Sequence, residues 1–421
     1  MLAMAENTGV PAPLRLDLDI VPTEHEGRPI LVLRDPEGLT DKVLAVSPGA
    51  LAVAALFDGR RSFRRLQEDL AKDGAGALLE SDIAGLAKEL DAAGMLETPE
   101  VARGRRSLLE AFKASPKRSM ALKGAYPEAP LELAGSLGAY FRDAKGPGKP
   151  LADKPTRADA PLGLLSPHID LARGGPAYAW SYGALAEAPP PDVVVAFGVA
   201  HASPDSPWVM TKKEYETPHG AMAVDAELYG ELSSALWYDP TADEWAHRRE
   251  HSLEFQALWL RFLWRDKTPP WVPILCSSFE RFCPDRPPSS VETVDKALEK
   301  MGAALAKQAA KGRRVLVLGG VDLAHVGPRF GDDLELGPEL DKRVETEDRK
   351  SLAHAMKRDA DAFYLSVVAD GHWRKVCGLS AIYSSLRCLN ALGAKDGELL
   401  TYGQAPDPAG GMVSFASAVF R

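Results

Sequence analysis

The 421-residue chain contains little cysteine: Cys276, Cys283, Cys377 and Cys388 are its only cysteines, and no two of them form a C-x-x-C pair. Four cysteines in a chain of this length, without paired spacing, exclude a disulfide framework. A reducing cytoplasm is therefore the expected location. No apolar run is long enough to span a bilayer, so no membrane partner is expected. Residues 1–13 lack a basic segment followed by an apolar core, so no secretion signal is predicted.

The chain also lacks an excess of positive charge. It has 50 lysines and arginines against 59 aspartates and glutamates, which gives a net charge of -9 and a pI near 5.6. This balance disfavours nucleic acid as a partner. Hydrophobic residues make up 45% of the chain and charged residues 26%, as in ordinary globular proteins. The length predicts two or three domains.

Residues 14–98 are expected to form a small winged-helix domain. Ile30–Leu33 reads as a strand, and Ser47 and Ser62 are expected to cap two helices. The run Leu56-Phe57-Asp58-Gly59-Arg60-Arg61-Ser62 and the hydrophobic spacing up to Leu96 resemble the PqqD-like peptide-recognition domain. That resemblance implies binding of a precursor peptide as an added edge strand. The alternative is a winged-helix module for packing or dimerisation. Residues 99–117, polar and basic, are expected to be a linker with one helical piece.

From residue 162 onward, short apolar strands alternate with helical patterns, which indicates a three-layer α/β domain over 118–421. The expected strands include 162–166, 193–199 and 314–321; the expected helices include 176–186 and 247–263. Ligands collect beyond the carboxyl ends of strands in such sheets. His168 and His201 follow the first two of these strands, and Asp322 and His325 follow the third.

His168, His201 and Cys377 are the predicted metal ligands. Imidazole nitrogen and thiolate suit iron or copper, with zinc also possible. Gly378 precedes an expected helix, whose N-terminus would favour the thiolate of Cys377. Taken singly, each histidine has a simpler interpretation as a hydrogen-bonded residue at a strand end, and the cysteine as a small buried residue. Only the combination predicts a metal centre.

Further polar residues are candidates for catalysis. Asp322 is expected to fix the tautomer of a metal-bound imidazole, and His325 to transfer a proton; a helix cap and a surface histidine are the alternative. Residues 247–251 match H-x-x-E-H, the pattern of inverted zinc peptidases, although no partnering glutamate motif follows. We instead expect Glu250, His251 and Glu254 on one helix face pointing into the cleft, with Glu250 and His251 as catalytic residues.

Ordered blocks between residues 118 and 421 resemble the Memo family, known in bacteria as AmmeMemoRadiSam system protein B. The blocks are Leu122-Lys123-Gly124-Ala125-Tyr126-Pro127, Ser166-Pro167-His168, Gly198-Val199-Ala200-His201, Thr217-Pro218-His219-Gly220, Glu250-His251-Ser252-Leu253-Glu254, Asp322-Leu323-Ala324-His325 and Cys377-Gly378. The resemblance implies a fold like that of the class III extradiol dioxygenases (LigB-like). It also implies iron or copper on the residues matching His168, His201 and Cys377, a redox role, and a radical-SAM protein as a companion.

The chain departs from the Memo pattern beside the predicted ligands. Residues 169–175, Ile-Asp-Leu-Ala-Arg-Gly-Gly, stand where the family usually has Ala-Gly-Tyr-x-Tyr-Ser-Gly. Ala202 replaces a second histidine, and residues 379–381 replace Arg-His-Pro. The ligands are kept while the pocket has changed, and Asp170 becomes a hypothetical additional carboxylate ligand.

These observations favour a metal-dependent redox enzyme, dioxygenase-like in fold, that acts on a peptide delivered by the PqqD-like domain. Two alternatives stay open at this point. One is a non-catalytic scaffold whose pocket recognises a phosphorylated or modified peptide, and the other is a zinc peptidase that uses Glu250.

Overall fold

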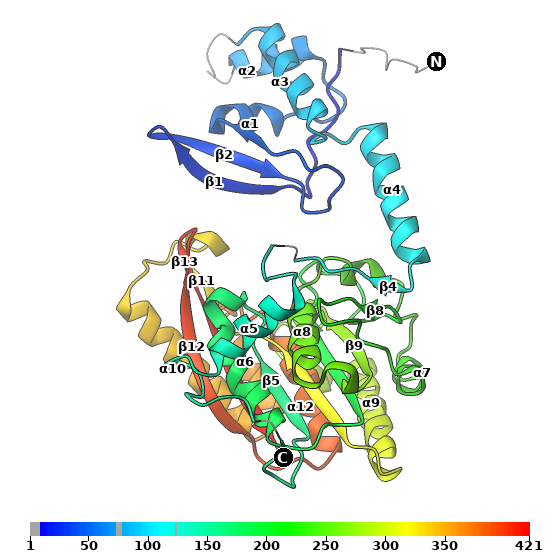
Figure 1. Ribbon diagram of the computed structural model, residues 1–421. Coiled ribbons are helices and arrows are strands. Elements are labelled where there is room, and N and C mark those ends of the chain that lie inside the picture. Colours follow the sequence, from blue (N-terminus) through cyan, green and yellow to red (C-terminus); the bar gives the residue numbers. More distant parts are fainter. Residues whose placement is uncertain (1–8, 73–77, 123, 153) are drawn as a thin grey trace. The chain divides into compact units, whose positions relative to one another are not determined.

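The computed structural model describes residues 9–72, 78–122, 124–152 and 154–421 (Figure 1). Most of the segment searched for a secretion signal, and Lys123 of the first Memo-like block, lie outside the described residues. The chain divides into two compact units, residues 1–114 and 115–421. Within the described parts of the chain, no helix is both long enough and apolar enough to cross a membrane.

The first unit begins with a three-stranded antiparallel sheet in the order β1-β2-β3. Its elements are β1 (Asp19–His25), β2 (Arg28–Arg34), β3 (Leu44–Val46), α1 (Pro48–Ala54), α2 (Phe63–Lys72), α3 (Glu80–Ala92) and α4 (Pro99–Ala114). Ser47 caps α1 by accepting a hydrogen bond from the Ala50 amide, as predicted. Leu33, Leu66 and Leu90 pack in the core of this unit. The expected linker contributes α4, while the PqqD-like assignment and the domain limits stay predictions.

The second unit is built on an eight-stranded mixed sheet in the order β11-β13-β5-β10-β6-β9-β7, with β12 paired to β13. The strands are β5 (Gly163–Ser166), β6 (Val193–Val199), β7 (Trp208–Met210), β9 (Trp271–Cys276), β10 (Val315–Gly320), β11 (His325–Val326), β12 (Glu398–Asp407) and β13 (Gly411–Phe420). The neighbouring strands β5, β10, β6 and β9 run parallel, so their carboxyl ends meet at one edge. A separate parallel pair joins β4 (Lys117–Arg118) to β8 (Glu214–Tyr215).

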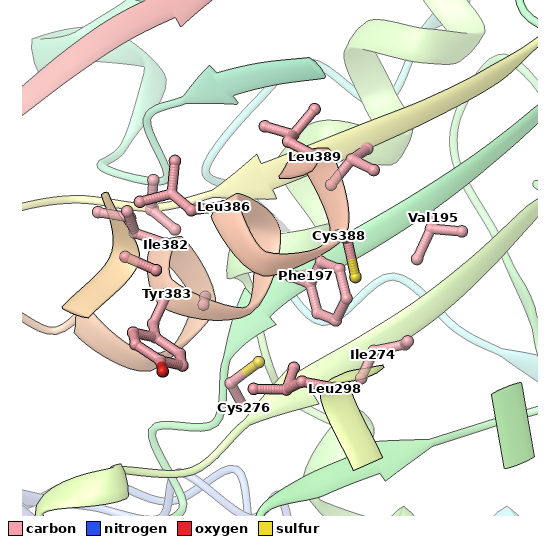
Figure 2. Close-up of a cluster of buried hydrophobic side chains, with 14 of the residues drawn as sticks. Val195, Phe197, Ile274, Cys276, Leu298, Ile382, Tyr383, Leu386, Cys388 and Leu389 are labelled. Carbon is pink, nitrogen blue, oxygen red and sulfur yellow. The ribbon is translucent and has the colours of Figure 1, made fainter. Parts of the chain in front are cut away.

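Helices cover both faces of this sheet. One layer contains α5 (Pro130–Tyr140), α6 (Leu171–Ala186) and α8 (Ser252–Trp264); the other contains α7 (Ala226–Ser234), α9 (Glu292–Ala310), α10 (Pro338–Met356), α11 (Ala360–Val368) and α12 (Leu379–Ala391) (Figure 1). Alternate side chains of β6 enter the two layers, since Val193, Val195 and Phe197 pack with the second group and Val194 and Ala196 with the first. Figure 2 shows α12 lying over Val195 and Phe197. The predicted three-layer α/β fold is confirmed.

Two helix starts differ from the prediction. The helix expected at 176–186 begins at Leu171, because Asp170 rather than Pro176 is its start signal: the Asp170 side chain accepts from the Arg173 amide. The helix expected from His247 begins only at Ser252, preceded by a short 3-10 turn at Glu244–His247. This second difference decides where Glu250, His251 and Glu254 point.

Candidate metal centre

Three neighbouring parallel strands each deliver a site residue at the same offset. His168, His201 and Asp322 lie two residues beyond the ends of β5, β6 and β10. In the sheet β10 lies between β5 and β6, so the three side chains start from adjacent positions. The strand-end rule used on the sequence therefore placed these residues correctly.

His251, directly before α8, completes a cluster with His168 and His201. One ligand nitrogen from each of the three lies within 4.8 Å of the other two. The ring centroids are 5.2 Å apart for His168 and His201, 5.3 Å for His168 and His251, and 4.8 Å for His201 and His251. These three histidines form a site that could hold a metal ion.

Close backbone packing brings the start of α8 to the strand ends. A Cβ on Gly198 would lie 2.6 Å from Ser252 Oγ, and one on Gly320 would lie 2.7 Å from the Ser252 carbonyl oxygen. Ser252 Oγ accepts from the Val199 amide at 3.0 Å. Gln256 Nε2 donates to the Pro167 carbonyl at 2.7 Å. Glycine at 198 and 320 is thus required for His251 to approach the other two histidines.

In each imidazole the Nδ1 atom already has a partner, which leaves Nε2 for a metal. His168 Nδ1 lies 3.1 Å from the Gly320 carbonyl oxygen, and His201 Nδ1 lies 3.0 Å from both carboxylate oxygens of Glu250. His251 Nδ1 lies 3.4 Å from Glu250 Oε1. Acceptors at Nδ1 select the tautomer with a free Nε2 lone pair, the usual arrangement around metal-binding histidines.

Cys377 joins this cluster from a distant part of the chain. Its Sγ lies 3.4 Å from His168 Nε2, and the following Gly378 amide donates to the Asp322 carbonyl at 3.2 Å. A side chain at position 378 would meet that carbonyl oxygen at 2.5 Å, so the approach needs glycine. Asp322 Oδ1 in turn accepts from the His168 amide at 2.9 Å. The predicted ligands His168, His201 and Cys377 and the predicted supporting residue Asp322 therefore lie together.

The electrostatics favour a thiolate at Cys377. Burial by itself raises the pKa of Cys377, but the adjacent His168, His325 and His201 outweigh burial and hold this pKa well below its usual value. Burial alone would lower the pKa of His168, but Asp322 and Cys377 outweigh burial and raise this pKa above its usual value, to about 9. A cation bound at the same place would stabilise the thiolate as these positive charges do.

Glu250 sets the charge state of the other two histidines. Burial raises the pKa of Glu250, but His201 and His251 overcome this effect and keep its pKa well below the ordinary value. Burial lowers the pKa of His251 to about 3, although Glu250 opposes the shift. His251 is therefore a neutral imidazole at physiological pH and Glu250 a carboxylate, as expected of a residue that orients metal ligands.

The histidine cluster forms the floor of a cavity of about 430 Å³. His325 lies in its wall, with Nδ1 3.1 Å from the Leu323 carbonyl oxygen and its ring 5.1 Å from that of Phe330. Ile169, Phe255 and Val413 add apolar surface to the wall. The cavity gives a substrate access to the predicted catalytic residues His251, Asp322 and His325.

One expectation, one disfavoured alternative and one hypothesis drawn from the sequence do not hold in the structure. Neither Glu250 nor Glu254 lines the cavity: Glu250 precedes α8 and lies beside the Nδ1 atoms of His201 and His251, while Glu254 lies in the first turn of α8 and pairs with Arg118. His247 is not near a shared metal position, because its ring is buried between the Tyr215 hydroxyl at 2.7 Å and the Val209 carbonyl at 3.0 Å. The H-x-x-E-H pattern thus assembles no zinc site. Asp170 caps α6 and pairs with Arg173, so it does not offer its carboxylate to the histidines.

Sequence reasoning missed two arginines that line the cavity, Arg173 and Arg329. Arg173 lies in the block that departs from the Memo pattern, and that departure was the available signal. No sequence signal marked Arg329. His251 was expected to be catalytic, and its place in the histidine cluster depends on the exact start of α8.

The comparisons with known proteins agree with this architecture. The family model described as Memo-like protein matches residues 118–419. A MEMO1 family protein of Aquifex aeolicus is 28% identical over 92% of this chain and 95% of its own length. A MEMO1 family protein of Methanopyrus kandleri is 27% identical over 72% of this chain and 99% of its own length. A MEMO1 family protein of Thermotoga petrophila is 32% identical over 50% of this chain and 70% of its own length. Since the family model covers well over half of the chain, including every residue of the histidine cluster, the chain belongs to the Memo family.

Proposed function

We propose that this chain is a metal-dependent redox enzyme whose iron or copper ion is held by His168, His201 and Cys377. One observation carries the proposal: three imidazoles that line a cavity each bring one ligand nitrogen within 4.8 Å of the others, beside a cysteine whose pKa is lowered. Two imidazoles and a thiolate suit these metals, and zinc is chemically compatible. When bound, iron or copper supplies one-electron chemistry, which the thiolate tunes by donating electron density.

The remaining side chains have distinct roles in this proposal. Three protein ligands leave a coordination position open, as catalytic sites require. His251 keeps an unprotonated Nε2 and accepts a hydrogen bond from the reacting group. Burial lowers the pKa of His325, but Cys377 and Asp322 outweigh burial and raise it, so His325 serves as the proton donor. Glu250 and Asp322 hold the rings of His201 and His168 in place.

We further propose that the substrate is a precursor peptide presented by the first unit. In support, β1 and β3 form the two edges of its sheet, and an extended peptide binds a sheet edge through backbone hydrogen bonds. A radical-SAM protein is the proposed companion enzyme, on the basis of the family resemblance.

Metal loading tests the assignment of ligands. Purified wild type, Cys377→Ala and His251→Gln are loaded with Fe(II) or Cu(II), and metal content and visible absorption are measured. We expect one ion per chain and a sulfur-to-metal absorption band in the wild type. Cys377→Ala should lose the band and bind metal more than about 10–100-fold more weakly, since loss of a ligand exceeds the effect of losing a supporting hydrogen bond. His251→Gln should keep both.

Cys388→Ala is the matched control, because Cys388 is a buried thiol on α12 within the hydrophobic core (Figure 2). A wild type without iron or copper above background contradicts the enzyme assignment. If His251→Gln loses the ion and Cys377→Ala retains it, the ligands are the three histidines instead. If His168→Ala binds peptide with the affinity of the wild type and neither protein converts a substrate, the chain is a scaffold.

A further inference from the structure

We propose that the cavity above the histidine cluster binds its substrate through a single carboxylate, which is held by Arg329 together with the free edge of Arg173. This inference rests on the proposed function, because it assigns the substrate class of the same cavity. Both arginines line the cavity, at residues that the metal chemistry does not use.

Asp170, Arg173, Arg329 and Asp407 line the more exposed side of the cavity, which is called its mouth below. Each carboxylate oxygen of the two aspartates already accepts a hydrogen bond from the protein. Asp170 Oδ1 accepts from the Arg173 amide, and Asp170 Oδ2 accepts from Arg173 Nε. Asp407 Oδ2 accepts from Arg173 Nη1 at 3.2 Å, and Asp407 Oδ1 accepts from the Ala409 amide at 2.9 Å. The two carboxylates thus hold Arg173 rigid and outnumber its single positive charge, while its Nη2 group has no hydrogen bond to a residue that the structure describes and can donate to a ligand.

Arg329 is the second cation of the mouth. Its backbone is fixed, since the Arg329 amide donates to the Gly410 carbonyl at 2.8 Å and Lys375 Nζ donates to the Phe330 carbonyl at 2.6 Å. Its exposed guanidinium has neither an ion pair nor a hydrogen bond to any residue that the structure describes. A guanidinium offers five N–H donors in a planar fork that matches a carboxylate. The mouth therefore presents donors and needs an acceptor.

The charge count favours a carboxylate over a phosphate dianion. Asp170 and Asp407 carry two negative charges and Arg173 and Arg329 carry two positive charges, so the mouth is neutral overall, and a dianion would add a larger uncompensated charge than a carboxylate does. Between the mouth and the histidines the wall is apolar, with Ile169, Phe255 and Val413. The substrate class is thus a molecule with a carboxylate at one end, an apolar middle and its reacting group over His168 and His251.

Calorimetric titration of the full chain, stripped of metal with a chelator, tests this inference. The probes are phenylacetate, phenylacetamide and phenyl phosphate, together with the tripeptide Gly-Gly-Phe with a free or an amidated C-terminus. The variants are Arg329→Gln and Arg329→Lys. Arg286→Gln is the matched control, because Arg286 is an exposed arginine that does not line the cavity.

We expect phenylacetate to bind the wild type, and phenylacetamide to bind about 10–100-fold more weakly, as for loss of a charged hydrogen bond. Arg329→Gln should weaken phenylacetate by a similar factor and leave phenylacetamide unchanged. The affinity of Arg329→Lys for phenylacetate should lie between those of the wild type and Arg329→Gln, and the affinity of Arg286→Gln should equal that of the wild type. Stronger binding of the free-acid tripeptide than of phenylacetate assigns the carboxylate to a peptide C-terminus; the reverse order assigns it to a small acid.

Three results overturn the inference: equal binding of acid and amide, an acid affinity unchanged by Arg329→Gln, or no acid binding at millimolar concentration. Stronger binding of phenyl phosphate than of phenylacetate refutes the single-charge argument. Since the protein is metal-free in these titrations, acid binding that depends on Arg329 can persist when metal loading fails. Conversely, metal can bind normally when Arg329 has no effect, so the two failures are distinguishable.

Discussion

Glu250 and Glu254 stand four residues apart and are both buried, yet they organise two different regions of the second unit. The Glu250 region is the metal centre: its carboxylate receives the His201 amide at 2.9 Å and the Ser252 amide at 2.8 Å and lies beside the Nδ1 atoms of His201 and His251. All of these partners belong to strand ends or to the start of α8. Glu250 therefore orients groups that face the cavity.

The Glu254 region is structural. Its carboxylate pairs with Arg118, whose side chain is fully buried, and accepts from the Ala121 and Leu122 amides and the Tyr126 hydroxyl. Arg118 also donates to the Glu250 carbonyl, which ties the two regions together. Identical residues with similar burial thus perform different tasks, because α8 begins between them. The difference should be visible when each glutamate is neutralised in turn.

The largest expected effect is that of Glu254→Gln on stability. It leaves the Arg118 charge buried without a counter-ion, which typically costs about 3–5 kcal/mol. All eight tryptophans lie between residues 180 and 373, so tryptophan fluorescence during urea unfolding reports on the second unit alone. Glu292→Gln, which removes an exposed pair with Lys296, is the control and should change little. An equal loss of unfolding free energy in both variants would mean that the buried pair of Arg118 and Glu254 stabilises the fold no more than an exposed pair does.

Glu250→Gln should have an intermediate effect, expressed in metal affinity rather than in stability. The amide cannot orient His201 and His251 as the carboxylate does, so we expect metal binding to weaken about 10–100-fold. Competition with a chromophoric chelator measures the change. Glu254→Gln, tested at a temperature where it stays folded, should bind metal almost as the wild type does. If the two variants lose affinity equally, the separation of the two regions is wrong.

The same contrast explains how much of the site the sequence could predict. His168, His201 and Asp322 were predictable because apolar strand runs end two residues before each of them, and parallel strands align such ends. Cys377 was found by chemistry and family resemblance. The roles of Glu250 and Glu254 were not separable, because helical spacing at i and i+4 assumed a helix that starts only at Ser252. That start depends on the tertiary contact of Ser252 Oγ with Val199.

For the fold, too, local patterns were predictable from the sequence and long-range pairs were not. The limits predicted for β6 hold, since it is a run of buried residues between polar or proline-containing segments. Arg118, which directly follows the polar and basic stretch expected to be a linker, is fully buried against Glu254, and the sequence analysis did not predict this pair. Local composition cannot reveal a partner 136 residues away in the chain. What sequence patterns leave open here is long-range pairing of charges.

The smallest expected effect is that of His247→Gln on the pH dependence of folding stability. Burial lowers the pKa of His247 to about 3, from an ordinary value near 6.5. The unfolded chain therefore binds this proton first, and folding stability falls as the pH drops below about 6.5, by up to about 1.4 kcal/mol per pH unit. His247→Gln can accept from Tyr215 and donate to Val209 without titrating, so its stability should decline less steeply between pH 6.5 and 5. Urea unfolding of the metal-free proteins, followed by tryptophan fluorescence, measures both slopes. Other titrating groups contribute equally to the two proteins, and identical slopes would show that His247 does not resist protonation in the folded state.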